Sequence, residues 1–343
     1  MFVMLRNLLL FTLLAGLTAC SDPGPQKVKL EGRTMGTTYH ITYIDPTGQQ
    51  DEQQLQQKID AVLLQVNQVA STYMPDSELS RFNSMQSTTP VQASAMMQLL
   101  VKEGVQLGEL TQGYLDPTVG PLVNLWGFGP THRPEKAPSD AEIAAMLPQI
   151  GYHQIQLNGD QLSKTRPELY IDMSSFAKGY GVDAVAELLD QNQIHNYLVE
   201  IGGELKTKGQ SLAQKDWVIA VEKPMTDEQV VQRLFQPKDN AVATSGDYRI
   251  FFEENGQRFS HLIDPKTGRP VTHRVASVTV VHPSCMRADG LATGFLVMGV
   301  DKALEIANAE QLAVMLIEKN PDGSFTEHYS EAFKPYLHQM SQN

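Results

Sequence analysis

Two hydrophobic periods follow one another near the start of the chain, and their order restricts the fold more than the overall composition does. From residue 28 to residue 45 apolar and polar side chains alternate, which predicts a β-hairpin interrupted between Gly32 and Gly36. Residues 52–70 instead carry apolar side chains at steps of four and three, at Leu55, Ile59, Val62, Val66 and Val69. This spacing predicts an amphipathic helix with one face toward the core.

The rest of the chain continues the same mixture of periods. Helices are expected over residues 94–110, 140–147 (after Ser139 as N-cap), 182–189 and 302–309, and from about residue 288. Strands are expected at residues 169–172, 197–201, 217–221, 276–281 and 312–317, with a hairpin of residues 249–253 and 257–263 around Asn255 and Gly256. Hairpins beside helices favour an α+β fold, with a largely antiparallel sheet and flanking helices, over a βαβ repeat.

The first nineteen residues are typical of an export signal rather than of the folded protein. Arg6 precedes a short apolar run, and the run ends in small residues before Cys20. This order resembles a bacterial lipobox, in which the cysteine thiol of Cys20 accepts a diacylglycerol. Residues 20–27 then form a lipidated tether, and residues 28–343 form one domain with room for a smaller subdomain. The alternative is an ordinary signal peptide in which the cysteine has no role.

The charge and cysteine content restrict the partners of the mature protein. The formal net charge is −12, and removal of Arg6 with the leader makes the chain one unit more negative. An acidic chain without a basic run is a poor candidate for nucleic-acid binding, which depends on Lys and Arg at phosphates. An anionic ligand would instead need a metal ion or helix N-termini. Once Cys20 is lipidated Cys285 has no cysteine left to pair with, so no internal disulfide is expected.

Residues 172–181 form the first segment that can carry chemistry. An acid, Asp172, is followed by Ser174 and Ser175, and small residues then lead through Lys178 into the expected helix. Exposed N–H groups at a helix start suit a phosphate or carboxylate, and Lys178 adds a full charge. The alternative is a helix that is simply capped by Ser174, and taken alone this segment fits that reading better.

Residues 288–294 form the second segment. Asp289 and Thr293 are four positions apart, so on a helix they share a face. A carboxylate, a hydroxyl and a nearby carbonyl make a set of hard oxygens that suits Mg²⁺, which also takes ligand phosphates. The alternative is a helix start at which Asp289 merely opposes the helix dipole.

Residues 261–270 form the third segment. His261 precedes a Pro/Gly turn and is suited to accept a proton near neutral pH, although most histidines in such positions are structural. Tyr73, Tyr114 and the Trp126–Phe128 segment offer rings on which a flat ring system can stack, or are core aromatics. Gly202-Gly203 and residues 244–247 are either loops of close approach or plain turns.

Together these segments resemble the ApbE family, the FAD:protein FMN transferases. The resemblance runs from the lipobox through residues 34–39, 75–83, 115–123, 172–181, 200–204, 243–248, 261–270 and 288–294, in the family's order. It covers nearly the whole mature chain. It implies an α+β fold related to the T-fold, in agreement with the hairpin-rich pattern.

The resemblance also implies roles for individual residues. FAD, the substrate, would contact Met35, Tyr73, Tyr114, Leu115, Asp116, Asp172, Lys178 and Ile263. Mg²⁺, the cofactor, would lie near Ser175, Asp289, Thr293 and, through its carbonyl, Ala292. His261 would be the general base or proton shuttle.

The family's reaction moves FMN from FAD to a threonine hydroxyl and releases AMP. The acceptors implied are subunits of membrane electron-transfer complexes, of the Na⁺-pumping quinone reductase or Rnf type, reached by a lipid-anchored enzyme on the periplasmic side, with the inner membrane favoured. Two alternatives stay open: a Mg²⁺-dependent FAD pyrophosphatase, recognised by AMP release without an acceptor, and a non-catalytic FAD-binding lipoprotein, recognised by tight FAD binding without AMP.

Overall fold

A central antiparallel sheet of eight strands organises the computed structural model, which describes residues 24–129, 136–224, 231–247, 251–254 and 256–337. Its strand order is β1-β2-β6-β7-β10-β15-β16-β17, and every neighbouring pair is antiparallel. The strands are β1 (Gln26–Thr34), β2 (Thr37–Asp45), β6 (Tyr197–Ile201), β7 (Glu204–Lys208), β10 (Ala241–Gly246), β15 (Val275–His282), β16 (Ala313–Lys319) and β17 (Phe325–Tyr329). The α+β class and the antiparallel sheet are as predicted.

The first hairpin forms where the alternating pattern placed it. Thr34 pairs with Thr37 across a two-residue turn, in which Met35 and Gly36 both have positive φ (50° and 74°). Positive φ at both turn residues matches the twist of the flanking strands. Gly32 lies within β1, at a position where a larger side chain would not fit, because a Cβ there would come 2.6 Å from the ring of Tyr39. The predicted interruption is therefore a tight turn plus one close contact.

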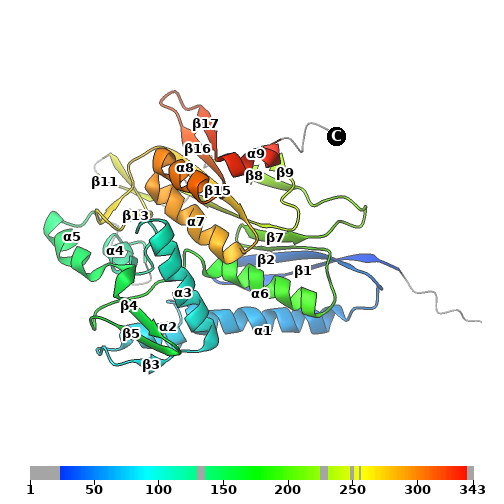
Figure 1. The fold of residues 1–343 in the computed structure, drawn as a ribbon, viewed down its shortest axis with the longest axis horizontal. Helices are drawn as coiled ribbons and strands as arrows, with labels where there is room; N and C mark the ends of the chain where they lie inside the picture. Colours follow the sequence, from blue (N-terminus) through cyan, green and yellow to red (C-terminus); the bar gives the residue numbers. More distant parts are fainter. Residues whose placement is uncertain (1–23, 130–135, 225–230, 248–250, 255, 338–343) are drawn as a thin grey trace, which may run out of the picture.

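Five longer helices lie against the sheet and one another (Figure 1). They are α1 (Glu52–Ala70), α3 (Ala95–Leu110), α6 (Ala177–Gln191), α7 (Cys285–Met298) and α8 (Val300–Ala309). Helices α1 and α6 share a hydrophobic cluster with β1, β2 and β6. Helix α7 packs on β10 and β15, and it also contacts α3 and α6. The crossing of α6, α7 and α3 sets up the site described below.

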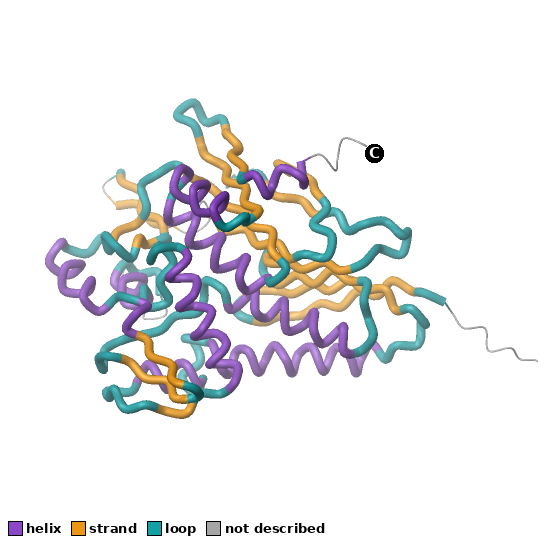
Figure 2. Tube along the Cα trace, in the orientation of Figure 1, coloured by secondary structure: helices purple, strands orange, loops and turns teal. Residues whose placement is uncertain are grey.

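The shorter elements surround this frame, and Figure 2 shows them by type. A small sheet of order β3-β5-β4 lies beside α2 and α3. Three two-stranded hairpins pair β8 with β9, β11 with β12, and β13 with β14. The strands are β3 (Val91–Gln92), β4 (Ile155–Asn158), β5 (Gln161–Lys164), β8 (Ile219–Glu222), β9 (Val231–Phe235), β11 (Phe251–Glu254), β12 (Gln257–Ser260), β13 (Ile263–Asp264) and β14 (Arg269–Pro270). The helices are α2 (Glu78–Ser84), α4 (Gly120–Leu125), α5 (Asp140–Met146) and α9 (Lys334–Leu337), with 3₁₀ turns at Leu147–Gln149, Tyr152–Gln154 and Glu331–Phe333.

Three local predictions are corrected. Residues 169–172 are not a strand, because the side chain of Asn83 takes the place of a neighbouring strand: its amide donates to the carbonyl of Ile171 and accepts from the Ile171 N–H, both at 2.8 Å. Within α1 Leu63 is buried at 2 % exposure, whereas Val62 is partly exposed. Helix α7 begins at Cys285, because Ser284 Oγ caps it by accepting the Arg287 N–H.

Several predictions fall on parts of the chain outside the described residues. These are the export signal at residues 1–19, the lipidation site Cys20, the start of the tether, residues 249–250 and the turn residue Asn255. Among the residues that the structure describes, no helix has the length and apolarity needed to cross a bilayer.

Candidate functional site

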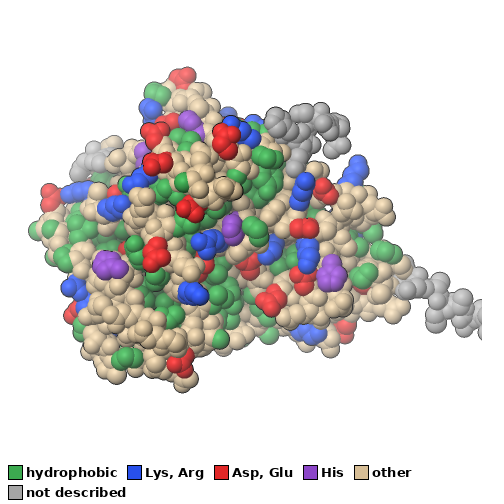
Figure 3. Space-filling view, viewed as in Figure 1, with side chains coloured by type: hydrophobic (Ala, Val, Ile, Leu, Met, Phe, Trp, Pro, Cys, Tyr) green, Lys and Arg blue, Asp and Glu red, His purple; other side chains and the backbone are tan. Residues whose placement is uncertain are grey.

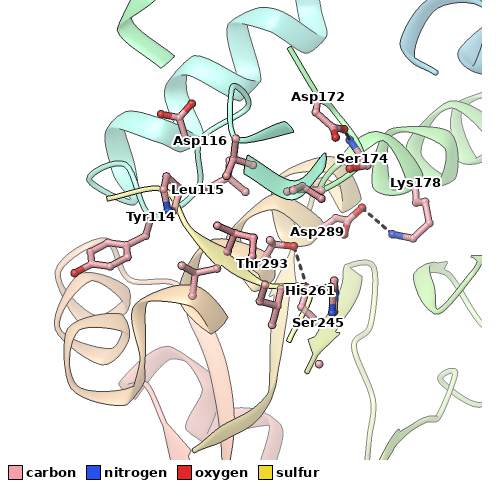
Figure 4. A pocket seen from close by; sticks show the side chains of 18 of the residues that line it. Tyr114, Leu115, Asp116, Asp172, Ser174, Lys178, Ser245, His261, Asp289 and Thr293 are labelled. Carbon is pink, nitrogen blue, oxygen red and sulfur yellow. Dashed lines mark hydrogen bonds and ion pairs between the residues drawn. The ribbon is translucent and has the colours of Figure 1, made fainter. Parts of the chain in front are cut away.

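A cavity of about 380 Å³ lies where α6, α7 and the loop after α3 meet (Figure 4). Its volume falls within the range of small-molecule sites. The lining includes most of the residues singled out from the sequence: Tyr114, Leu115, Asp116, Asp172, Ser175, Lys178, His261, Ile263, Asp289 and Thr293. It also includes residues that had no assigned role, among them Gly202, Glu204, Thr244, Ser245 and Gly246.

Three of the expected site residues do not line this cavity. Met35 occupies the β1–β2 turn, and its side chain packs against Gly181 of α6. The contact is close: a Cβ built on Gly181 would come 2.9 Å from Met35 Cε. Tyr73 follows α1 and is 71 % exposed. Ala292 is fully buried in the hydrophobic core, so only its backbone carbonyl is available for the predicted metal contact. The roles of these three residues stay predictions.

Asp289 links two helices at the inner end of the cavity. Its Oδ2 accepts a hydrogen bond from the Gly179 N–H at 2.9 Å. Gly179 lies in the first turn of α6, where backbone N–H groups have no partner within the helix, so Asp289 provides the acceptor for one of them. The helix N-cap is Phe176 and makes no side-chain cap, so the alternative in which Ser174 caps the helix is not what forms. Gly179 permits this contact, because a Cβ there would lie 2.4 Å from the carbonyl oxygen of Cys285.

Lys178 lies between two buried carboxylates. Its Nζ is 3.3 Å from Glu204 Oε2 and 3.8 Å from Asp289 Oδ2. Burial raises the pKa of both carboxyl groups, and Lys178 opposes that rise. Burial alone would lower the pKa of Lys178, but the charges of Asp289 and Glu204 outweigh it and raise that pKa. The ammonium therefore stays charged and offsets part of the negative charge at this end.

The hydroxyl groups complete a set of oxygen atoms. Thr293 lies one turn after Asp289 on α7, and its Oγ1 is 3.1 Å from Ser245 Oγ of β10. Ser175 lines the same cavity just before α6. One carboxylate with hydroxyl oxygens is a donor set that suits Mg²⁺, which keeps waters or substrate phosphates as its other ligands. In the described part of the chain no three His, Cys, Asp or Glu residues converge as a metal site.

His261 also lines the cavity, in the bend between β12 and β13. Its ring meets the edge of the Phe128 ring, with centroids 6.3 Å apart. Trp126 is 2 % exposed, and its Nε1 donates to the Gly268 carbonyl at 2.8 Å. Trp126 therefore holds the turn that follows His261. Of the two roles left open for its ring, stacking on a ligand or packing in the core, the structure shows core packing.

Tyr114 and Asp116 lie on the side of the cavity away from Lys178 (Figure 4). Lys266 Nζ lies 3.9 Å from the centroid of the Tyr114 ring, and Lys302 Nζ lies 5.0 Å from it. The Asp116 carboxylate accepts the backbone N–H groups of Thr118 and Tyr152, at 2.8 and 3.0 Å. Both of its oxygens are thus occupied by the protein, so the Asp116 side chain shapes this loop.

Glu204 is the charged residue among those lining residues that the sequence analysis left without a role. It follows the Gly202-Gly203 turn, in which both glycines have positive φ (59° and 105°). The turn brings Glu204 against Lys178 from a different element. In the sequence, the two glycines before Glu204 were the feature that could have indicated a site here, but a plain turn explained them equally well.

Comparisons with known proteins show the family to which the chain belongs. The family model described as the ApbE family matches residues 35–316. The chain is 51% identical to the FAD:protein FMN transferase of Vibrio cholerae over 321 residues, which is 94% of this chain and 96% of that protein. It is 48% identical to the protein of the same name from Haemophilus influenzae, over 93% of each chain. The solved structure of the flavin transferase ApbE from Vibrio cholerae superimposes with a TM-score of 0.85 at 50% identity, covering 91% of this chain and 100% of that one.

Proposed function

The chain belongs to the ApbE family and is an FAD:protein FMN transferase, and from that premise we propose that it transfers FMN to a threonine hydroxyl in a Mg²⁺-dependent reaction that releases AMP. The observation that carries the proposal is the buried Asp289 carboxylate with the Thr293 hydroxyl one turn away, beside the Lys178 ammonium. These groups meet at the start of α6, where N–H groups favour an anion.

The residues at the inner end would hold the diphosphate of FAD. Asp289, Thr293 and Ser175 are the groups that would hold Mg²⁺, with the Ala292 carbonyl as the fourth expected contact. The ion would supply charge neutralisation at the phosphate oxygens. The Lys178 ammonium would orient the diphosphate, because the N–H groups of Ala177 and Gly179 at the start of α6 are already held by the Met173 carbonyl and by Asp289. Asp172 and Ile263 also line the cavity.

His261 would accept the proton of the acceptor threonine. The threonine oxygen forms a bond to the phosphorus on the FMN side, and the bond between that phosphorus and the bridging oxygen breaks. AMP leaves with the bridging oxygen, and the threonine proton passes to His261. The products are a phosphoester of FMN on the acceptor and AMP.

The location and the acceptor follow from the same family resemblance. We propose that Cys20 carries a lipid and holds the enzyme on the periplasmic face of a bacterial membrane, with the inner membrane favoured. The acceptors proposed are subunits of membrane electron-transfer complexes of the Na⁺-pumping quinone reductase or Rnf type. A lipid anchor would keep the enzyme close to such subunits.

The test is transfer between purified components. The enzyme is incubated with FAD, MgCl₂ and an acceptor domain, and the acceptor is weighed by mass spectrometry. The expected result is a mass gain of one FMN residue, which is FMN less one water. The gain should be lost when the acceptor threonine is replaced by valine, when EDTA is added, or in Asp289→Ala. Transfer that persists in EDTA would remove Mg²⁺ from the proposal. AMP formation without any acceptor would favour FAD hydrolysis instead.

A further inference from the structure

Glu204 is a buried acid for which the reaction described above has no use. Its side chain is 5 % exposed, and it begins β7, where it pairs with Ile201 across the Gly202-Gly203 turn. A buried carboxylate is costly unless it is paired. Its ion-pair partner in the structure is Lys178, which belongs to a different element of the cavity. The Glu204–Lys178 ion pair therefore joins two residues that line the cavity, and does not join two strands of the sheet.

The Lys178 side chain is confined from two directions. A Cβ built on Gly202 would lie 3.4 Å from Lys178 Cδ, so the turn packs along the alkyl stem. The ammonium lies 0.5 Å nearer to Glu204 than to Asp289, at 3.3 Å against 3.8 Å. Figure 4 shows Lys178 reaching toward Asp289 from α6. The ammonium is thus within ion-pair distance of both carboxylates and lies nearer to the one on β7.

Asp289 is occupied by the protein at one oxygen. Its Oδ2 accepts the Gly179 N–H and faces the ammonium, whereas Oδ1 has no hydrogen-bond partner among the described residues. Without the charge of Glu204, Asp289 would be the remaining carboxylate beside the ammonium, and Lys178 would be drawn onto it. A divalent cation would then have to displace Lys178 before it could bind the same carboxylate.

We propose that Glu204 is a positioning residue, which holds the Lys178 ammonium away from Asp289 so that Asp289 keeps an oxygen for a divalent cation. The inference rests on the proposed function, since it concerns the metal site assigned there. Groups that orient metal ligands without touching the metal commonly set its affinity.

The test measures metal binding without turnover. Mg²⁺ alone is titrated into the protein by isothermal titration calorimetry, with no FAD present. Glu204→Gln is expected to weaken Mg²⁺ binding by about 10- to 100-fold, the usual effect of losing an outer-shell partner. Glu200→Gln is the matched control: it neutralises an acid of the same hairpin whose carboxylate contacts His40 and the Gly203 N–H, and it should bind Mg²⁺ as the unmodified protein does.

A second background separates positioning from a simple charge effect. In Lys178→Met there is no ammonium to hold, so Glu204→Gln should change Mg²⁺ affinity by less than about threefold there. An equal loss in both backgrounds, or no loss in either, would overturn the proposal. If Glu204→Gln does not fold, as judged by its thermal melt, Glu204→Asp replaces it; its shorter side chain should give a smaller loss, and unchanged affinity would again overturn the proposal. If the unmodified protein binds no Mg²⁺ without FAD, the positioning proposal is overturned, because it requires Asp289 to hold the ion before the substrate is bound. The transfer assay with and without EDTA then decides the proposed function separately.

Discussion

His261 illustrates how one residue can be tested apart from its surroundings. It lines the same cavity as Asp289 and Thr293 and does not belong to the hydrophobic clusters of the fold. Its proposed task is proton acceptance, which matters when the threonine oxygen attacks and not when FAD binds. Binding and transfer should therefore respond differently to its removal.

For His261→Ala we expect FAD affinity to stay close to that of the unmodified protein and the transfer rate to fall about 100- to 10,000-fold, the usual worth of general acid–base catalysis. The rate is measured as FMN-labelled acceptor under single-turnover conditions, and FAD affinity by quenching of flavin fluorescence. An unchanged rate would remove His261 from the mechanism.

At the scale of elements, the site depends on how closely α6 crosses α7. Gly179 is the point of closest approach, since a Cβ there would lie 2.4 Å from the Cys285 carbonyl, a backbone atom that cannot turn aside. The same approach lets the Gly179 N–H reach Asp289. Gly290 repeats the arrangement on the other side of α7, where a Cβ would lie 2.4 Å from Leu107 of α3.

Gly179→Ala is therefore expected to lower the free energy of unfolding by about 1–3 kcal/mol, the usual cost of overpacking, and to weaken FAD binding because Asp289 moves. Urea denaturation measures the first effect and flavin fluorescence the second. Gly181→Ala on the same helix is the control, because its Cβ would meet the flexible end of Met35, at 2.9 Å, and should cost less. Equal stability losses in the two variants would contradict this account.

The α3–α7 contact carries a pH dependence of its own. Glu103 of α3 is buried and lies 3.3 Å from Arg287 of α7. Burial raises the pKa of Glu103 above its ordinary value, although Arg287 lowers it in part. The folded state therefore binds this proton more tightly than the unfolded state does. The stability that the protonated acid contributes is present below about pH 4.3, the ordinary value for Glu, and is lost as the pH rises through the folded pKa.

In Glu103→Gln we expect the loss of stability caused by deprotonation of Glu103 to disappear. The free energy of unfolding of the unmodified protein should fall relative to that of the variant as the pH rises from about 4 upward, and the difference should become constant above the folded pKa. Urea titrations at a series of pH values measure it. Parallel profiles across that range would show that Glu103 keeps its ordinary pKa in the folded state.

At the scale of the whole molecule, the proposed lipid anchor at Cys20 would decide where the enzyme works. The chain carries a formal net charge of −12. On the face drawn in Figure 3 acidic and basic side chains are interspersed and do not form one extended patch of a single sign. We therefore expect membrane attachment to depend on the lipid proposed at Cys20 and not on basic side chains of that face.

Cys20→Ala is expected to move the protein from the membrane fraction to the soluble periplasmic fraction without changing its transferase rate in solution. Cys285→Ala is the matched control: its thiol is fully buried in the fold, so membrane attachment should persist. Fractionation followed by immunoblotting measures both. Membrane attachment of the Cys20→Ala variant would show that another feature holds the protein there.

The sequence alone determined the features that are periodic or local. The hairpin before residue 45, the helix at residues 52–70 and the cap at Ser139 depend on side chains that are neighbours in the chain, and each forms as predicted. The motifs that carry the family resemblance also contain most of the residues that line the cavity.

Only the tertiary structure decided how these segments act on one another. Asp289 of α7 accepts an N–H group at the start of α6, and Glu204 of β7 pairs with Lys178 of α6. Asn83 takes the place of a neighbouring strand beside residues 169–172. Likewise, the burial of Leu63 rather than Val62 depends on what α1 packs against. Hydrophobic period and turn chemistry depend on a residue's own stretch of chain, whereas these contacts join segments far apart in sequence, and packing of the sheet and helices alone brings them within a few ångströms.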